Sequence, residues 1–179
     1  MISKTKLLWL NEGINVLKED GHEKLTIDEL SSRLKLTKGS FYHHFKNRQD
    51  YILALLQFWE DNSTQQLIHL SQKEETAREK LDRLTELVTN LENGSLEIKI
   101  RAWAAHDKII RSYQQRVDTI RMNYVKDLCS SVYKDRVDTD LLAQIYLMIF
   151  IGAQHLIPPI NGKDLQQLFM TISQLIPKK

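Results

Sequence analysis

Residues 25–48 constrain the fold of this chain more than any other stretch, because they predict two short helices joined by a tight turn. Thr26 and Glu29 have the spacing of a capping box at the start of the first helix. Thr37 is a favourable N-cap for the second helix, which we expect to end near Phe45. Apolar side chains are spaced to pack these two helices against each other: Ile27, Leu30 and Leu34 on the first, and Phe41 and Phe45 on the second.

The rest of the chain also has the periodicity of helices. Three prolines and six glycines in 179 residues leave few breaks, and no stretch predicts a strand. Gly21 follows the first helix where a left-handed cap is expected. We therefore expect an all-α protein. The longer predicted helices span residues 4–20, 48–72, 74–91, 110–128, 141–156 and 165–176.

Positive charge is concentrated in the second short helix and its flanks. Five cationic side chains and no Asp or Glu lie between Arg33 and Arg48, whereas the whole chain carries a formal net charge of only +2. Lys38 has the length to reach a guanine edge or a phosphate, and Tyr42 adds a hydroxyl group. A basic helix with hydroxyl, aromatic and imidazole groups suits the phosphate-lined groove of DNA. The second short helix is therefore our candidate for insertion into the major groove.

Residues 5–55 resemble the DNA-binding domain of the tetracycline-repressor (TetR) family of bacterial transcriptional regulators. The resemblance is carried above all by Thr37-Lys-Gly-Ser-Phe-Tyr-His-His-Phe-Lys-Asn-Arg48 and the long helix that follows. It implies a three-helix DNA-binding head with a helix-turn-helix at residues 1–47, and a helical ligand-binding and dimerisation body at residues 48–179. It also implies DNA contacts from Thr26, Thr37, Lys38, Gly39, Ser40, Tyr42, His43, His44, Lys46 and Arg48.

The chain departs from the family pattern at two positions in the helix-turn-helix. Lys35 occupies the turn position where the family usually has glycine. A non-glycine residue held at positive φ there costs on the order of 1 kcal/mol. Ser31 stands where the family usually has alanine between the two helices. Serine fits that volume, so we expect it to have little effect.

The aromatic side chains of the body have two interpretations, a ligand cavity or ordinary core packing, and the sequence favours neither for any one residue. His106 lies one turn past Trp103 on a mostly apolar helix, where it either orients a ligand or extends to water. An apolar body favours a largely hydrophobic or aromatic effector. The candidate pocket residues are Trp59, Trp103, His106, Tyr113 and Tyr124.

The last two predicted helices are candidates for a dimer interface. Residues 141–156 are apolar nearly all round, which predicts burial on more than one side. Two such helices per chain form a four-helix bundle across a two-fold axis, whereas the alternative is a core within one chain. The candidate interface residues are Leu141, Ile145, Met148, Ile149, Gly152, Leu165, Leu168, Phe169 and Ile172.

Composition argues against several other classes of protein. The single cysteine, Cys129, excludes an internal disulfide and a multi-cysteine metal site. His43 and His44 are adjacent on a helix and point about 100° apart, so they cannot share one metal ion. The most apolar run, residues 145–153, is far shorter than the ~20 residues that span a bilayer. We expect a cytoplasmic protein that is not an enzyme, needs no cofactor or metal, and does not bind a membrane.

The sequence as a whole predicts a homodimeric regulator that binds a palindromic operator in double-stranded DNA. A small lipophilic effector of unknown identity would release it. We expect repression rather than activation of transcription, because most regulators of the family that the chain resembles are repressors. An activator or a ligand-independent regulator is the alternative, and a helical interaction module or enzyme that has lost DNA binding is a further one.

Overall fold

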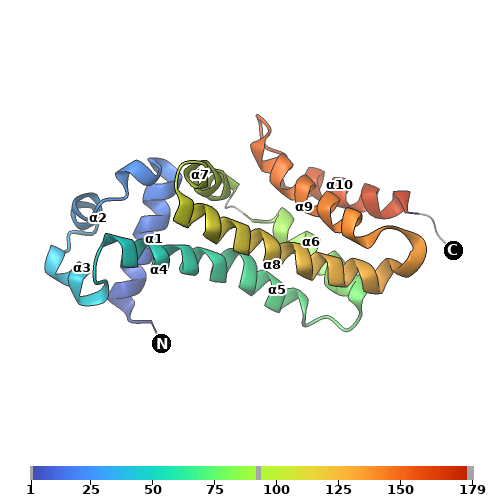
Figure 1. The fold of residues 1–179 in the computed structure, drawn as a ribbon, viewed down its shortest axis with the longest axis horizontal. Helices are drawn as coiled ribbons and strands as arrows, with labels where there is room; N and C mark the ends of the chain where they lie inside the picture. The colour runs from blue at the N-terminus through green and yellow to red at the C-terminus, as the bar shows by residue number, and fades with distance from the viewer. Residues whose placement is uncertain (1, 92–93, 177–179) are drawn as a thin grey trace. The chain divides into compact units, whose positions relative to one another are not determined.

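The structure, a computed structural model, describes residues 2–91 and 94–176 (Figure 1). Among these residues every regular element is a helix, as the sequence predicts. The α-helices are α1 (Lys4–Glu19), α2 (Ile27–Leu34), α3 (Lys38–His44), α4 (Arg48–Glu60), α5 (Gln66–Ser71), α6 (Ala77–Thr89), α7 (Gly94–Ala104), α8 (Lys108–Tyr133), α9 (Thr139–His155) and α10 (Gly162–Leu175). Short 3-10 turns cover His22–Lys24 and Lys134–Arg136.

The chain divides into two compact units. Unit 1 contains residues 1–62 and 95–114, and unit 2 contains residues 63–94 and 115–179. One boundary between the units falls inside α8. This division differs from the predicted functional boundary after residue 47, because α4 packs on α1 within unit 1. The predicted boundary between a DNA-binding and a ligand-binding part remains a prediction.

The packing of α4 on α1 depends on one hydrogen bond and one glycine. The hydroxyl of Tyr51 on α4 donates to the backbone carbonyl of Trp9 on α1 at 2.8 Å, and both residues are buried. A Cβ atom at Gly13 would lie 2.0 Å from that hydroxyl and 3.1 Å from the methyl groups of Leu55. Burial raises the pKa of Tyr51, so its hydroxyl stays protonated and donates.

The helix predicted at residues 48–72 is helical throughout but not uniform. The side chain of Asn47 caps α4 by accepting from the backbone N–H of Asp50 at 2.9 Å. A π-helical segment, Asp61–Gln65, then separates α4 from α5, which ends at Ser71. The amino-acid pattern does not reveal this segment, because one extra residue in a turn changes the apolar spacing too little to be recognised.

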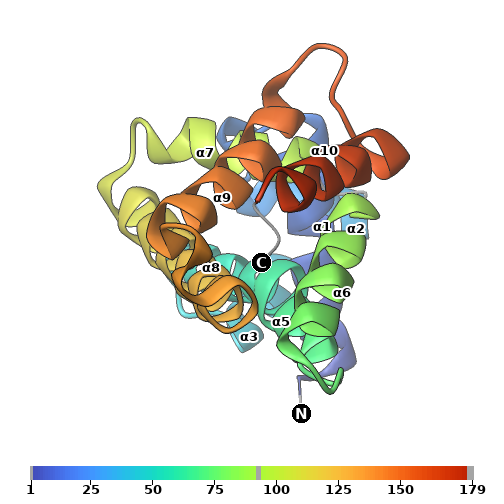
Figure 2. The same cartoon turned by 90° about the vertical axis from the view of Figure 1, so that its right-hand side faces the viewer.

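Unit 2 is built from helices that pack on one another around an apolar core. α6 lies against both α5 and α10, and α10 lies against α9 (Figure 2). The rings of Tyr146 on α9 and Phe169 on α10 stack with centroids 5.5 Å apart. Thr76 and Glu79 form a complete capping box at the start of α6. The core of unit 2 includes Leu81, Leu128, Cys129, Tyr133, Leu142, Ala143 and Leu165.

Candidate nucleic-acid interface

The helix-turn-helix has the predicted form. Thr26 caps α2 by accepting from the backbone N–H of Glu29 at 3.1 Å, and Thr37 caps α3 by accepting from that of Ser40 at 3.2 Å. The turn residue Lys35 adopts the left-handed conformation, with φ 54° and ψ 37°. The strained lysine predicted from the family pattern is therefore confirmed.

The predicted capping box at Thr26 is only half formed, which corrects the sequence analysis. The backbone N–H of Thr26 donates to the carbonyl of Lys24 at 2.7 Å rather than to Glu29. The Glu29 carboxylate instead accepts from Nε of Arg33 at 2.8 Å. An arginine one turn ahead competes for the carboxylate with the backbone donor, and sequence spacing alone does not show which one wins.

α3 has one buried face and one exposed face. Phe41 and Phe45 are buried as predicted, and their ring centroids are 5.1 Å apart. Trp9 packs edge-on against Phe41 at 5.3 Å, which fixes the buried face on α1. Four of the predicted DNA-contact residues on α3 are exposed, and Ser40 and His44 are half-buried. The exposed ones are Lys38, Gly39, Tyr42 and His43.

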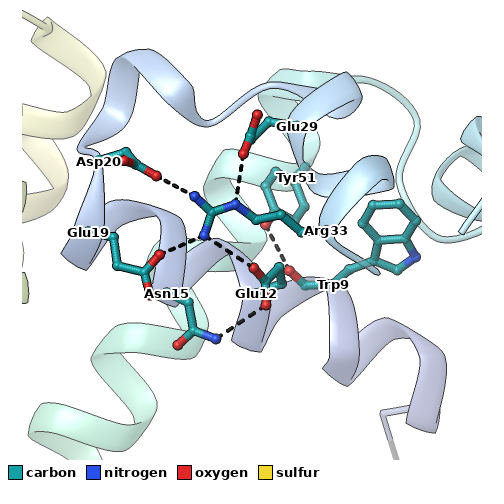
Figure 3. Close-up of polar contacts among 8 residues, drawn as sticks. All are labelled: Trp9, Glu12, Asn15, Glu19, Asp20, Glu29, Arg33 and Tyr51. Atoms are coloured by element: carbon teal, nitrogen blue, oxygen red, sulfur yellow. Dashed lines mark hydrogen bonds and ion pairs between the residues drawn. The ribbon is translucent and has the colours of Figure 1, made fainter. Parts of the chain in front are cut away.

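Arg33 is not an available cation, although the sequence analysis counted it in the basic stretch. Its guanidinium makes ion pairs with four carboxylates from α1, the end of α1 and α2 (Figure 3). The N···O distances are 2.7 Å to Glu19, 2.8 Å to Glu29 and 3.6 Å to Glu12, and Asp20 is the fourth partner. Hydrogen bonds that its guanidinium donates to Glu29 and Glu19 raise the pKa of Arg33. This arginine therefore ties α2 to α1.

The other cations of the stretch are placed differently. Nζ of Lys38 lies 2.5 Å from the carboxylate of Asp28, and both side chains are largely exposed. The hydrogen bond that the ammonium donates to Asp28 raises the pKa of Lys38. Nε of Arg48 donates to the carbonyl of Leu25 at 3.0 Å, which anchors this side chain just before α2. Lys46 is exposed in the short link between α3 and α4.

One cation beside α3 was missed by the sequence analysis. Nζ of Lys6 on α1 lies 5.1 Å from the ring centroid of Phe45. The rings of His43 and His44 are 4.9 Å apart. Burial, His43 and Lys6 together lower the pKa of His44. Lys6 comes near α3 only in the folded structure, because it lies 37 positions before His43 in the sequence.

The predicted pocket residues are divided between the two units, with Tyr124 in unit 2 and the other four in unit 1. Trp59 and Trp103 are buried in unit 1, where the ring of Trp103 stacks on His22 at 5.0 Å. The hydroxyl of Tyr113 donates to the side chain of Gln57 at 3.0 Å, and His106 is exposed. Of the five predicted residues, only Tyr124 lines the cavity described next.

A cavity of about 70 Å³ lies within unit 2. Tyr124 reaches its wall while its hydroxyl contacts Oγ of Ser71 at 2.7 Å. Nε of Arg121 donates to Oγ1 of Thr64 at 2.9 Å, and Arg121 is the only charged side chain among the described residues of the wall. The lining comprises Ser63, Thr64, Leu67, Ile68, Leu81, Leu84, Thr85, Val88, Arg121, Tyr124, Val125, Tyr146, Leu147, Phe150 and Phe169.

The predicted interface residues fall into two groups. Leu165 and Phe169 are buried inside unit 2, at 2% and 4% exposure, because they face α6 and α9 in the same chain. The apolar side chains of Leu141, Met148 and Leu168 are exposed at 51%, 59% and 39%, and Gly152 is also exposed. Half-buried members complete the predicted set: Ile145, Ile149 and Ile172.

The described residues offer neither a metal-binding cluster nor a helix suited to span a membrane. Within residues 2–91 and 94–176, no group of three or more His, Cys, Asp or Glu side chains is arranged to hold a metal ion. No helix in the same part of the chain is long and apolar enough to cross a membrane.

Comparison of the sequence with known proteins finds similarity in the N-terminal region. Residues 10–55 match the family described as bacterial regulatory proteins, tetR family. The chain is 35% identical over 51 residues to the transcriptional regulator AcuR of Cereibacter sphaeroides, which covers 28% of this chain and 23% of that protein. It is 47% identical over 36 residues to the transposon Tn10 TetC protein of Escherichia coli, covering 20% and 18% respectively. The chain thus matches less than a quarter of the length of either relative.

Comparison of the structures extends the similarity to nearly the whole chain, at low sequence identity. The reduced form of NemR from E. coli has a TM-score of 0.81 and 18% identity, covering 98% of this chain and 100% of that one. A transcriptional regulator from Saccharomonospora viridis, in complex with choline, has a TM-score of 0.80 and 16% identity, covering 99% and 100%. GusR from Salmonella enterica has a TM-score of 0.75 and 14% identity, covering 96% and 95%. These likenesses establish the fold.

Proposed function

The chain belongs to the TetR family of bacterial regulatory proteins, and we propose from this that it is a homodimeric repressor of transcription that a small ligand releases from DNA. Regulators of this family are not enzymes, in agreement with the sequence prediction. A bacterial protein that binds DNA works in the cytoplasm, so the proposal includes a cytoplasmic location. The observation that carries the proposal is the division of α3 into a buried aromatic face and an exposed face with Lys38, Tyr42 and His43.

That exposed face has the chemistry of a DNA-reading surface. Lys38 can leave Asp28 for a phosphate or guanine, because both partners of this ion pair are exposed and such pairs are weak in water. The hydroxyl of Tyr42 can donate to a phosphate. Lys46 and Arg48 flank α3 on its C-terminal side, where they can contact the DNA backbone. The hydroxyl of Thr26, at the start of α2, offers another phosphate contact.

Dimerisation is supported by the exposed apolar side chains of α9 and α10. Leu141, Met148 and Leu168 belong to two neighbouring helices, which suits a four-helix bundle with a second copy. A two-fold dimer presents two α3 helices to half-sites about one DNA turn apart, roughly 34–36 Å. This geometry predicts a palindromic operator.

Ligand response is supported by the cavity in unit 2. Its wall is mostly apolar, which favours a lipophilic or aromatic ligand. Arg121 and the absence of carboxylates among the described wall residues disfavour a cation, although one structural neighbour was solved with choline. The cavity of about 70 Å³ is smaller than the roughly 300–1,000 Å³ of typical ligand sites, so a drug-sized effector requires it to widen.

The small size of the cavity also favours a second candidate, a regulator that responds to no ligand. In that case the cavity is a packing defect of the core. Filling it would then stabilise the protein without changing its response to any compound. Activation of transcription rather than repression is equally compatible with an exposed α3.

The proposal is tested first by a mobility shift on DNA from upstream of the protein's own gene, at about 50 and 200 mM salt. If each head neutralises three or four phosphates, the slope of log K against log salt is about −5 to −7 for the dimer. We expect a retarded band containing two chains, with affinity that falls steeply at the higher salt. A protein that retards neither this DNA nor any genomic fragment at low salt contradicts the proposal.

A further inference from the structure

Three basic side chains from two helices lie near the C-terminal end of α3, around the ring of Phe45. Phe45, which caps α3, has its ring centroid 6.3 Å from that of His44 and 5.1 Å from Nζ of Lys6. His43 lies on the other side of His44, with ring centroids 4.9 Å apart. Lys6, His43 and His44 thus form one basic cluster, although Lys6 on α1 lies 37 or more residues from the two histidines on α3.

The position of Lys6 on its own helix is unfavourable. The backbone N–H of Lys6 donates to Oγ of Ser3 at 3.2 Å, so this residue belongs to the first turn of α1. The N-terminal end of a helix carries a partial positive charge and favours acidic residues. The first turn of α1 contains no acidic residue and carries both Lys4 and Lys6. A residue that lowers the stability of its own helix is typical of a functional position.

The surroundings of His44 disfavour the protonated form of its imidazole. The groups that act on its imidazole are His43 on α3 and Lys6 on α1, and both are bases. Burial and these two groups lower the pKa of His44, so the free protein holds it neutral near pH 7. An anion placed among the three groups reverses this effect, because it favours the protonated imidazole.

We propose that Lys6, His43 and His44 contact the phosphate backbone of DNA and that the His44 imidazole takes up a proton as DNA binds. This inference rests on the proposed DNA-binding function and adds a contact from α1 to the surface of α3. The cation–π contact with Phe45 holds the Lys6 ammonium in place before DNA arrives, which lowers the entropy cost of the contact. Phosphate contacts carry no sequence information, so the cluster contributes to affinity and register on any DNA.

The direction of the pH effect follows from the two protonation states. Above the pKa of His44 in the complex, the imidazole is neutral both free and bound, and affinity does not change with pH. As pH falls through that value the bound form gains a proton first, so DNA binds more tightly. Below the lowered pKa of the free protein both forms are protonated and the gain stops.

The first experiment measures salt dependence by fluorescence anisotropy, with a labelled 24-bp duplex of mixed sequence and with the upstream DNA. The variants are Lys6→Gln and the control Lys18→Gln, which removes the same charge about 18 Å further along α1. One lost phosphate contact lowers the salt slope by about 0.9 and the affinity about fivefold per head near 0.15 M salt. We expect that change in Lys6→Gln and not in Lys18→Gln.

The second experiment compares affinity at pH 7.5 and pH 6.0, with helicity checked at both. The wild-type protein is expected to bind about three- to tenfold more tightly per head at pH 6.0. His44→Gln should lose most of this gain, and the control His69→Gln, at an exposed position on α5, should keep it. An NMR titration of the imidazole protons without DNA should show a higher pKa for His44 in Lys6→Gln than in the wild type.

The outcomes separate this inference from the proposed function. Wild-type protein without salt-dependent affinity for any duplex overturns both. Wild-type protein that binds DNA, with Lys6→Gln matching Lys18→Gln in salt slope, overturns the inference alone. A pH response that persists in the His43→Gln, His44→Gln double variant also overturns it. Reduced slope in Lys6→Gln together with a flattened pH response in the histidine variants supports it.

Discussion

Unit 1 is fixed by directional contacts, whereas unit 2 encloses a cavity within apolar packing. In unit 1, Arg33 joins α2 to α1 and its C-terminal end through three carboxylates, and the Tyr51 hydroxyl donates to the backbone of α1. Such contacts have preferred angles, so they fix α2 and α4, which precede and follow α3, closely on α1. In unit 2 the cavity leaves space that a ligand or a small rearrangement can fill. The difference suits a surface that must keep its shape and a core that must respond.

The largest effect we expect comes from placing a charge on the exposed apolar face of unit 2. Met148→Glu should abolish self-association, because an interface core that contained it would bury an unpaired carboxylate. Sedimentation velocity over a range of protein concentrations measures the change. Leu53→Glu, at a 41% exposed position on α4 in unit 1, is the control and should leave the dimer intact. Equal dimer dissociation constants for both variants would remove α9 from the proposed interface.

Gly13→Ala should be the most destabilising small substitution in unit 1. The added Cβ would overlap the Tyr51 hydroxyl at 2.0 Å, and it must break the bond to Trp9 or push α4 away. We expect a loss of about 3 kcal/mol in the free energy of unfolding, measured by denaturant titration. Gly39→Ala in α3, measured without DNA, is the matched control, because its Cβ would meet only Oγ1 of Thr37, at an ordinary 3.6 Å, and it should be neutral or stabilising. Similar losses in both would show that the close approach at Gly13 is not special.

Ser31→Ala should stabilise unit 1, by about 1 kcal/mol. Among the described residues, the buried hydroxyl oxygen of Ser31 has no hydrogen-bond partner, so its desolvation is not offset. The volume of serine suits this position, as expected, but the burial of its polar atom does not follow from volume. Ser32→Ala, one position on and exposed, should change the melting temperature little. If Ser31→Ala melts at a lower temperature than the wild type, the hydroxyl has a partner in solution.

The smallest effect concerns the capping box of α6 in unit 2. The backbone and side chain of Thr76 donate to the Glu79 carboxylate and lower its pKa. The ionised Glu79 carboxylate therefore stabilises the folded state fully above its unfolded-state pKa near 4.5. This stabilisation is lost as pH falls through the lower pKa that Glu79 has in the folded state. Glu79→Gln keeps the geometry of the box without titrating. Thermal melts between pH 5 and pH 3 should fall less steeply in this variant, and parallel curves would contradict the assignment.

The sequence predicts local features of this molecule well. The caps at Thr37 and Asn47, the left-handed Lys35 and the buried Phe41 all depend on residues within a few positions of one another. Short-range steric and hydrogen-bonding rules determine such features, and they hold in almost any tertiary context. The helix-turn-helix can therefore be predicted from the amino-acid sequence alone.

Features that depend on distant residues were not predicted. Arg33 lies in a basic stretch of sequence, yet its partners Glu12, Glu19 and Asp20 come from α1 and its C-terminal end. Lys6 reaches α3 only because Trp9 and Phe41 pack α1 against it. The cavity is likewise lined from several helices of unit 2, and of the five predicted pocket residues only Tyr124 reaches it. Apolar periodicity shows that a side chain is buried but does not identify its neighbours.

The exposed face of α3 is the centre of this account, and the affinity of Tyr42→Ala for the upstream DNA tests it most directly. Tyr42 is 55% exposed, so its removal should leave the melting temperature and the dimer unchanged. We predict a loss of at least about tenfold in affinity, because the phosphate contact of the Tyr42 hydroxyl disappears. Tyr113→Phe in unit 1 serves as the control and should bind DNA normally. Unchanged affinity in Tyr42→Ala, in a folded dimer, would contradict the proposed role of α3.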